Sequence, residues 1–259
     1  MTQELIDTNV YIGPWPTRRV PGDDSAALTE MLRGHGVTQA WAGSFDSLLH
    51  KDIAGVNARL AQACAASGGL LVPFGAINPA LPQWEDDVRR CAEEHRMPGI
   101  RLHPNYHGYA LDDPRFTALL QAAADRKLLV QIAITMEDER MMHPLMQVPH
   151  VDVLPLPDLL AVHPGLRVVL LNAFRGVPMP LVQRLAETKQ VCFDLAWLEG
   201  AAGLEVLKKQ IPLERVLFGS YAPLFYFASS WLKLAESPLS ETERAALMCN
   251  NAAGLLAAP

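Results

Sequence analysis

Short runs of apolar and β-branched residues alternate along the chain with longer amphipathic stretches of helical spacing. The runs are Leu5–Ile12, Val37–Gly43, Leu70–Ile77, Gly99–Leu102, Leu128–Ile134, Arg167–Leu171, Val191–Leu195 and Val216–Phe218. The stretches between them repeat apolar residues every three or four positions, as amphipathic helices do, for example in Ser25–Arg33, Trp84–His95 and Pro114–Arg126. Strands that alternate with helices of this length predict right-handed βαβ units and a parallel sheet.

Chain length distinguishes between two parallel-sheet architectures. Eight strand–helix units in 259 residues favour a closed (β/α)8 barrel, a TIM barrel of the α/β class, which takes roughly 250 residues. No Gly-x-Gly-x-x-Gly motif opens the first expected helix, which disfavours an open dinucleotide-binding sheet. No linker or internal repeat divides the chain, so we expect a single domain over residues 1–259. Asp113 before Pro114, and Ser240 followed by Glu243, are typical starts of helices.

Composition and charge exclude several classes of partner. Half of the residues are hydrophobic and 19% are charged, which provides a large core and opposes disorder. The net charge of -6, without a Lys/Arg cluster, opposes a nucleic-acid partner. Apolar runs too short for a bilayer, and a start without a signal-peptide pattern, predict no membrane partner and a cytoplasmic location. The four cysteines are far apart and have no zinc-site spacing, which fits reduced thiols.

The densest group of chemically useful side chains is the segment GIRLHPNYHGY, at the end of the fourth expected strand. Arg101 and His103 share one face of that strand by the period-two rule, and Tyr106 and His107 follow on the loop. Arg101 could bind a carboxylate, His103 or His107 could act as a general acid or base, and Tyr106 could donate a hydrogen bond. The alternative is structural, with Arg101 paired internally and His103 a buried, satisfied residue.

Other expected strand ends add polar side chains to the same rim, because the active sites of such barrels lie at the carboxyl ends of the strands. These predicted ligand-contacting residues are Asn9, Tyr11, Gln131, Asn172, Asp194 and Tyr221. A buried Asp194 needs a partner, such as Arg101 or a histidine. Asn9, Asn172 and Tyr221 would form a neutral hydrogen-bonding pocket, or would simply fill the space and satisfy one another.

Six segments together resemble the amidohydrolase-related (amidohydrolase-2) family of TIM-barrel hydrolases and decarboxylases. They are LIDTNVYIG, MPGIRLHPNYHGYALDDPRF, LLVQIAIT, HPGLRVVLLNAF, RVLFGSYAP and SETERAALMCNNAAGLL, and they extend over nearly the whole chain. The resemblance implies an Asp-x-His-x-His motif after strand one, single histidines after strands five and six, and an aspartate after strand eight. In the family these side chains hold a divalent metal that polarises the substrate and activates water.

The metal-binding positions implied by the resemblance carry other side chains here. Asp7 is retained, but the positions of the ligands read Asn9, Tyr11, Ala133, Asn172 and Tyr221. Alanine cannot bind a metal, and amide and phenol oxygens are poor replacements for imidazole and carboxylate. We therefore expect a divergent member of the family that lacks the catalytic metal and needs no other cofactor.

Two functions remain open at this point. The first is a metal-independent hydrolase or lyase that acts on a small polar or carboxylate-bearing metabolite, with His103 or His107 as acid and base and Arg101 as the anchor. The second is a non-catalytic protein on the same fold that binds a small molecule or serves in an assembly. A deep pocket with a histidine of shifted pKa favours the first, and a barrel mouth filled by Tyr11 and Tyr221 favours the second.

Two surface segments carry further expectations. The segment Pro144–Pro157 is long and proline-stiffened for a loop after the fifth strand, so it is either a lid or wall of the site or a rigid surface loop. The segment LFYFASSWLKL gathers Phe225, Tyr226, Phe227 and Trp231 around the last barrel helix. So much apolar surface on one helix predicts a homo-oligomer, unless the C-terminal helices cover it.

Overall fold

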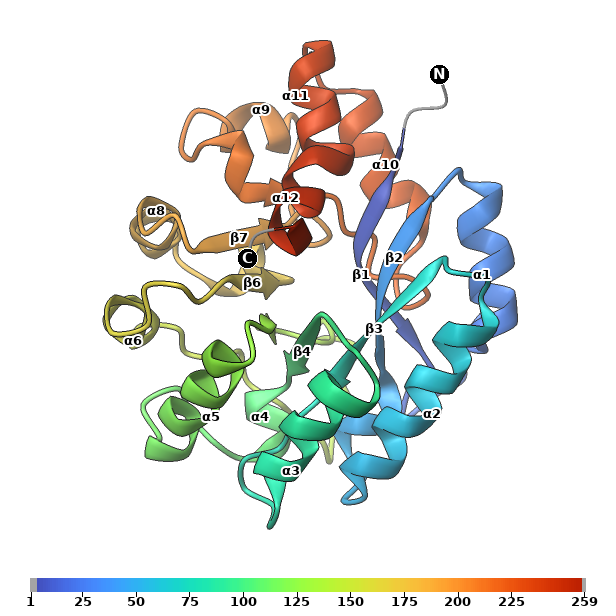
Figure 1. Ribbon diagram of the computed structural model, residues 1–259. Helices are drawn as coiled ribbons and strands as arrows, with labels where there is room; N and C mark the ends of the chain where they lie inside the picture. Colours follow the sequence, from blue (N-terminus) through green and yellow to red (C-terminus); the bar gives the residue numbers. More distant parts are fainter. Residues whose placement is uncertain (1–3, 258–259) are drawn as a thin grey trace.

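The eight expected strands form one parallel sheet that closes on itself. The computed structural model describes residues 4–257, and its strands follow the order of the chain, from β1 to β8 (Figure 1). The strands are β1 (Ile6–Ile12), β2 (Gln39–Ser44), β3 (Leu71–Ala76), β4 (Gly99–Leu102), β5 (Leu129–Ala133), β6 (Val168–Leu171), β7 (Val191–Asp194) and β8 (Val216–Leu217). The last strand returns to the first through a hydrogen bond of 2.9 Å from Thr8 N to Phe218 O and a parallel bridge between Val10 and Ala222. The predicted (β/α)8 architecture is confirmed.

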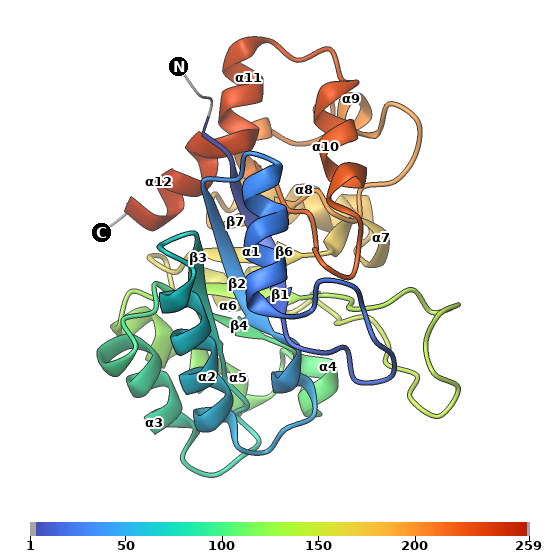
Figure 2. The same ribbon diagram turned by 90° about the vertical axis from the view of Figure 1, so that its right-hand side faces the viewer.

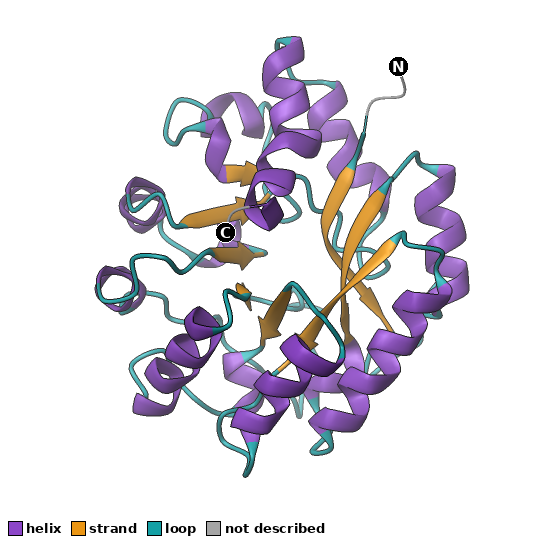
Figure 3. Cartoon of the chain, viewed as in Figure 1, coloured by secondary structure: helices purple, strands orange, loops and turns teal. Residues whose placement is uncertain are grey.

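Helices surround this barrel (Figure 3). They are α1 (Ser25–Gly34), α2 (Ile53–Ala66), α3 (Trp84–Arg89), α4 (Pro104–His107), α5 (Pro114–Asp125), α6 (Leu156–Ala161), α7 (Ala173–Gly176), α8 (Met179–Glu187), α9 (Gly203–Leu207), α10 (Phe227–Ala235), α11 (Glu241–Ala245) and α12 (Asn251–Ala257). Short 3₁₀ turns lie at Phe45–Leu48 and Leu213–Arg215, and π turns follow α3 and α11 at Arg90–Glu94 and Ala246–Asn250. The expected caps are present: Asp113 accepts from Arg115 N, and Ser240 and Glu243 form a capping box.

The two ends of the barrel interior are filled differently. At the N-terminal end, Ile6, Trp41, Phe74 and Leu129 belong to an apolar cluster against which Leu255 of α12 packs. At the C-terminal end, the cluster is largely aromatic and contains Tyr11, Trp15, Phe45, Met136, Trp197 and Tyr221. The polar side chains described below lie between these two layers, so they are shielded from solvent on both sides.

Two long loops project from the C-terminal end of the barrel (Figure 2). One connects β1 to α1 through residues 13–24, and the other connects β5 to α6 through residues 134–155. An ion pair between Arg18 and Glu137 joins them. Within the described part of the chain, no helix combines the length and the hydrophobicity needed to cross a membrane.

Candidate functional site

The predicted site residues come together at the C-terminal half of the barrel. Nine of them are buried, and Tyr106 is half-buried. The buried ones are Asn9, Tyr11, Arg101, His103, His107, Gln131, Asn172, Asp194 and Tyr221. The sequence pattern therefore located the cluster, but the structure gives its members little contact with solvent.

Arg101 lies on β4 and points across the barrel axis, fully buried. Its Nε donates to Gln131 Oε1 at 2.7 Å, and its Nη1 donates to Val10 O at 2.7 Å. Its Nη2 donates to Trp41 O at 2.8 Å and more weakly to Thr8 O at 3.4 Å. These acceptors are carried by four different residues on three neighbouring or facing strands, so the guanidinium ties the strands together inside the barrel.

Two further contacts fix the position of this side chain. The guanidinium carbon lies 4.4 Å from the centroid of the Tyr11 ring, a cation–π arrangement. A Cβ atom at residue 43 would lie 2.8 Å from Arg101 Cδ, so β2 needs glycine at that point. Burial lowers the pKa of Arg101, and the carbonyl dipoles around it compensate for lost hydration.

These contacts show that the pairing of Arg101 with Asp194, which the sequence suggested, is wrong. Among the interactions of the described residues, no hydrogen bond or ion pair joins Arg101 to Asp194. The guanidinium instead uses neutral carbonyl and amide oxygens, which sequence patterns do not reveal. The expected role in anion binding stays a prediction, and the structure gives this side chain no exposed surface for such a ligand.

Asp194 is engaged by two asparagines. Asn9 Nδ2 donates to Asp194 Oδ2 and to Asn172 Oδ1, both at 2.8 Å. The backbone N–H of Asn172 donates to Asp194 Oδ1 at 2.6 Å, and Asn172 Nδ2 donates to Thr135 O at 2.8 Å. Burial raises the pKa of Asp194. The three side chains therefore form a connected network, and most of their hydrogen-bonding capacity is used within the protein.

Asp7 is a buried carboxyl group whose environment the sequence analysis did not foresee. Its Oδ1 accepts from Ser220 N at 2.9 Å and from Asn9 N at 3.1 Å, while Oδ2 has no hydrogen-bond partner among residues 4–257. Burial raises the pKa of Asp7 to about 7. The signal that could have found it is a carboxylate placed inside a strand that is otherwise wholly buried.

Aromatic rings cover the polar layer toward the C-terminal end. Tyr11 stacks on Phe45 with ring centroids 4.6 Å apart and meets the edge of Tyr221 at 5.7 Å. The hydroxyl of Tyr221 donates to the backbone carbonyl of Met136, on the loop after β5. The hydroxyl of Tyr11 shares a hydrogen bond of 3.0 Å with His103 Nε2. The rings of Tyr11 and Tyr221 thus fill the space above the polar layer, and their hydroxyl groups hold them there by hydrogen bonds.

The two candidate acid–base residues are neutral and buried at this end. His107 Nε2 donates to Ser47 O at 2.8 Å, because a carbonyl oxygen can only accept. Burial lowers the pKa of His107 and holds the pKa of His103 well below its ordinary value. The Nδ1 atoms of both rings have no partner within the described residues.

A very small cavity lies beside His103. Its volume is about 10 Å³, and its lining includes Tyr106, Ala133, Met136 and the segment 148–151 of the loop after β5. Such a volume holds about one water molecule. Pro149 O accepts a hydrogen bond from Asn105 Nδ2, and Val151 N donates to Ile134 O at 2.9 Å, so this part of the proline-rich segment forms a wall of the cavity.

The residues at the positions that the resemblance implies for a metal have side chains that do not fit a divalent ion. Asn9 Nδ2 is a donor, the oxygen of Asn172 accepts from Asn9, and the Tyr221 hydroxyl is bonded to the backbone. Ala133 provides no donor atom, and the Tyr11 ring stacks on Phe45. In the part of the chain that the structure covers, no three His, Cys, Asp or Glu residues form a group able to hold a metal ion. We derive no catalytic step through a metal.

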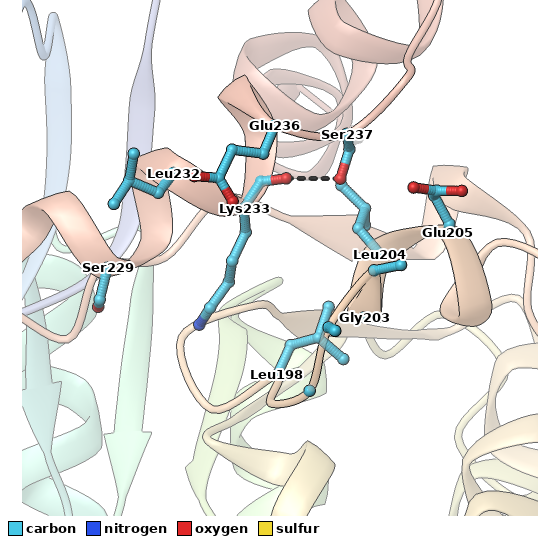
Figure 4. Close-up of a pocket in the computed structure, with 12 residues that line it drawn as sticks. Leu198, Gly203, Leu204, Glu205, Ser229, Leu232, Lys233, Glu236 and Ser237 are labelled. Atoms are coloured by element: carbon cyan, nitrogen blue, oxygen red, sulfur yellow. Dashed lines mark hydrogen bonds between the residues drawn. The ribbon is translucent and has the colours of Figure 1, made fainter.

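A larger pocket lies outside the barrel axis, between α9, α10 and the loop after β7 (Figure 4). Its volume is about 310 Å³, and Lys233 reaches from α10 along its wall. Lys233 Nζ donates to Leu195 O at 3.0 Å and to Ala196 O at 2.6 Å, and burial lowers the pKa of Lys233 to about 8. Glu205 and Glu236 also line the pocket, so its charges are mixed. The sequence did not indicate that Lys233 lies in a pocket. Its hydrogen bonds connect α10 to the residues that follow β7.

Comparisons with known proteins identify the family from the sequence and the fold from solved structures. The model of the amidohydrolase family matches residues 14–257, and no curated protein sequence matches the chain. A putative amidohydrolase from Staphylococcus aureus has a similar structure, with a TM-score of 0.74 and 13% identity over 98% of this chain and 99% of that one. The 2,6-dihydroxybenzoate decarboxylase from Rhizobium gives a TM-score of 0.74 and 14% identity over 99% and 98%. The 5-carboxyvanillate decarboxylase from Sphingomonas paucimobilis gives 0.74 and 15% over 99% and 100%. At these identities the structures show a shared fold, and the family model shows that the chain belongs to the amidohydrolase-2 family.

Proposed function

We propose that this chain is a non-catalytic member of the amidohydrolase-2 family, which binds a small molecule away from the site where its relatives carry out chemistry. The observation that supports this is the filled barrel mouth. The cavity beside His103 measures about 10 Å³, whereas pockets for small ligands measure roughly 300–1,000 Å³. A substrate cannot reach His103 without displacing side chains that are already bonded to one another.

The polar groups of the mouth support the same conclusion. A site prepared for substrate keeps donors and acceptors free to meet it. Here the N–H groups of Arg101 meet carbonyl oxygens and Gln131, and Asn9 and Asn172 are bonded to each other and to Asp194. The network resembles the interior of a stable core more than a preorganised site.

A second function, a metal-independent hydrolase or lyase acting on a small polar or carboxylate-bearing metabolite, is favoured by one observation. His103 is buried beside the small cavity with its Nδ1 unpartnered among residues 4–257, and Tyr106 lines the same space. A neutral imidazole with a free nitrogen is suited to general-base catalysis. This function requires the segment 148–151 to move away from Ile134 and Asn105, as a lid does.

An activity assay separates the two functions. Purified protein is incubated with 2,6-dihydroxybenzoate or 5-carboxyvanillate, with and without added Zn²⁺ or Mn²⁺, and release of carbon dioxide is measured. We expect no turnover above that of the His103→Ala variant. Turnover that disappears in His103→Ala would support the lyase and reject the non-catalytic function.

We also propose that the chain forms a homo-oligomer through the outer face of α10. Trp231 and Leu232 remain exposed on this helix, and Tyr226 precedes it with 89% of its surface exposed. Phe227 is buried and Phe225 is half-buried, so only part of the aromatic segment is available for contact with a second copy.

The cytoplasmic location stays a prediction.

A further inference from the structure

A groove lies where the barrel closes, between α1 and the segment that leads from β8 into α10. Its volume is about 380 Å³, which is within the range of small-molecule sites. Residues 18–22 of the loop between β1 and α1 bound one end, and residues 223–228 form the wall facing α1. We call this the α1–α10 groove. It lies on the outside of the sheet and shares no lining residue with the small cavity at His103.

The walls of the groove are apolar and partly aromatic. Leu28 and Met31 line it from one face of α1, and Phe225 and Phe227 line it from the opposite side. His35, one turn further along α1, stacks on Phe227 with ring centroids 4.4 Å apart and an interplanar angle of 16°. Flat surfaces of this kind accept a planar or compact apolar group.

One end of the groove carries two arginines. Arg18 and Arg19 belong to the lining, and the lining contains no Asp or Glu. The pocket of Figure 4 differs, since Lys233 shares its lining with Glu205 and Glu236. The α1–α10 groove therefore combines an apolar interior with guanidinium N–H donors at one end, which complement an anion that carries an apolar body.

Both guanidinium groups are held in place by ion pairs with carboxylates. Arg18 Nη1 pairs with Glu137, and Arg19 Nη2 lies 3.1 Å from Asp23 Oδ1. Both carboxylates are buried, whereas the side chains of Arg18 and Arg19 are 39% and 85% exposed. A guanidinium carries five N–H donors, and each of these ion pairs uses one nitrogen. Among residues 4–257 the other nitrogens make no hydrogen bond, although the guanidinium of Arg18 also lies 6.0 Å from the centroid of the Trp15 ring. These nitrogens can donate to a carboxylate, which arginine binds in a bidentate manner.

We propose that the α1–α10 groove binds a small aromatic or compact apolar carboxylic acid. The carboxylate meets Arg18 and Arg19, and the apolar body lies between Met31 and Phe225. This inference rests on the proposed function in one respect, namely that the chain binds its ligand without converting it.

Titration calorimetry with phenylacetate tests the inference, with phenylacetamide as the uncharged probe of the same shape. We expect saturable binding of phenylacetate and at least tenfold weaker binding of phenylacetamide, since one hydrogen bond to a charged group is worth roughly a factor of ten or more. Arg19→Gln should weaken phenylacetate binding about tenfold for the same reason. Ala228→Trp, which fills the groove from an exposed position, should abolish it.

Arg184→Gln is the matched control. Arg184 is an exposed arginine paired with Asp158 on the other side of the barrel, so its variant should bind phenylacetate as the wild type does. Absence of saturable binding at millimolar phenylacetate, or equal binding by wild type, Arg19→Gln and Ala228→Trp, would overturn the inference. Equal binding of phenylacetamide would overturn the anionic part of it.

The same proteins distinguish failure of this inference from failure of the proposed function. The groove variants leave the barrel mouth untouched, and His103→Ala leaves the groove untouched. Turnover lost in His103→Ala with normal phenylacetate binding would reject only the non-catalytic function. No turnover together with no binding would reject only the groove.

Discussion

The barrel mouth and the α1–α10 groove use polar side chains in opposite ways. In the mouth, Arg101 is fully buried, and the oxygens around its guanidinium belong to the protein. In the groove, Arg18 and Arg19 are held by buried carboxylates and keep nitrogens directed away from them. The mouth has space for about one water, and the groove has about 380 Å³. A charged residue at the rim of a barrel is therefore a weak sign of a ligand site, until its donors and the space around them are accounted for.

The largest expected effect concerns Arg101. Its replacement by alanine removes the hydrogen bonds to the carbonyls of Val10 and Trp41 and the contact with the Tyr11 ring. We expect a loss of about 5 kcal/mol in the free energy of unfolding, because several buried hydrogen bonds to a charged group are lost together. Urea denaturation measures this, with Arg184→Gln, whose partner Asp158 is exposed, as a control that changes stability by less than about 0.5 kcal/mol. A stable Arg101→Ala protein that no longer binds organic acids would restore Arg101 to a ligand-binding role.

The next effect is the dependence of stability on pH. The folded pKa of Asp7 is about 7 and its ordinary value is 3.8, so its contribution to stability is fully present below about pH 4 and is lost as pH rises through 7. The full loss is about 4 kcal/mol. The raised pKa of Asp194 acts in the same direction. The lowered pKa of His103 acts oppositely, since its contribution is lost as pH falls below 6.5.

Asp7→Asn isolates the first contribution, because the other groups titrate equally in both proteins. Asparagine keeps the oxygen that accepts from Ser220 N and carries no charge. We expect the variant to gain stability relative to wild type between pH 5 and 8 in urea denaturation. A constant difference between the two proteins over that range would show that Asp7 is ionised throughout.

A smaller effect is expected at the aromatic cover of the mouth. Tyr221→Phe keeps the ring and removes the hydrogen bond to Met136 O. We expect a loss of about 1 kcal/mol of stability, as for other buried hydrogen bonds. Tyr226→Phe, at an exposed position, is the matched control and should leave stability unchanged. Equal stability of the two variants would mean that the Tyr221 hydroxyl does not hold the loop after β5.

The smallest effect on the fold is expected at the outer face of α10. Trp231→Glu places a charge on an exposed position, so the melting temperature should change little while a dimer dissociates. Light scattering at high protein concentration measures this. A wild-type protein that is monomeric under those conditions would reject the homo-oligomer.

The sequence predicted the fold well because the information was local. The strand from Gly99 to Leu102 and the caps at Asp113 and Ser240 follow from patterns within a few residues. The parallel order followed from the length of the crossovers. Those features depend on neighbours in the chain, which the sequence displays directly.

The gathering of the polar residues at one end of the barrel was predicted, but their environment was not. Residues as distant as Asn9 and Asp194 were placed at one rim, because strand ends converge there. The partners of Arg101 were missed, because backbone carbonyls of Val10 and Trp41 are 91 and 60 residues away and carry no side-chain signature. The sequence could not decide between a deep pocket beside His103 and a mouth filled by side chains, because the answer depends on how the aromatic rings pack in three dimensions.

Metal content tests the central claim most directly, namely that the side chains of the barrel mouth have replaced the metal of the family. The protein is incubated with excess Zn²⁺ or Mn²⁺ and desalted. Bound metal is then measured by elemental analysis, and the melting temperature is recorded with and without a chelator. We predict far less than one metal per chain and a melting temperature unaffected by the chelator, because amides, phenols and Ala133 stand at the ligand positions that the resemblance implies. About one tightly held metal per chain, with a melting temperature that the chelator lowers, would contradict the account.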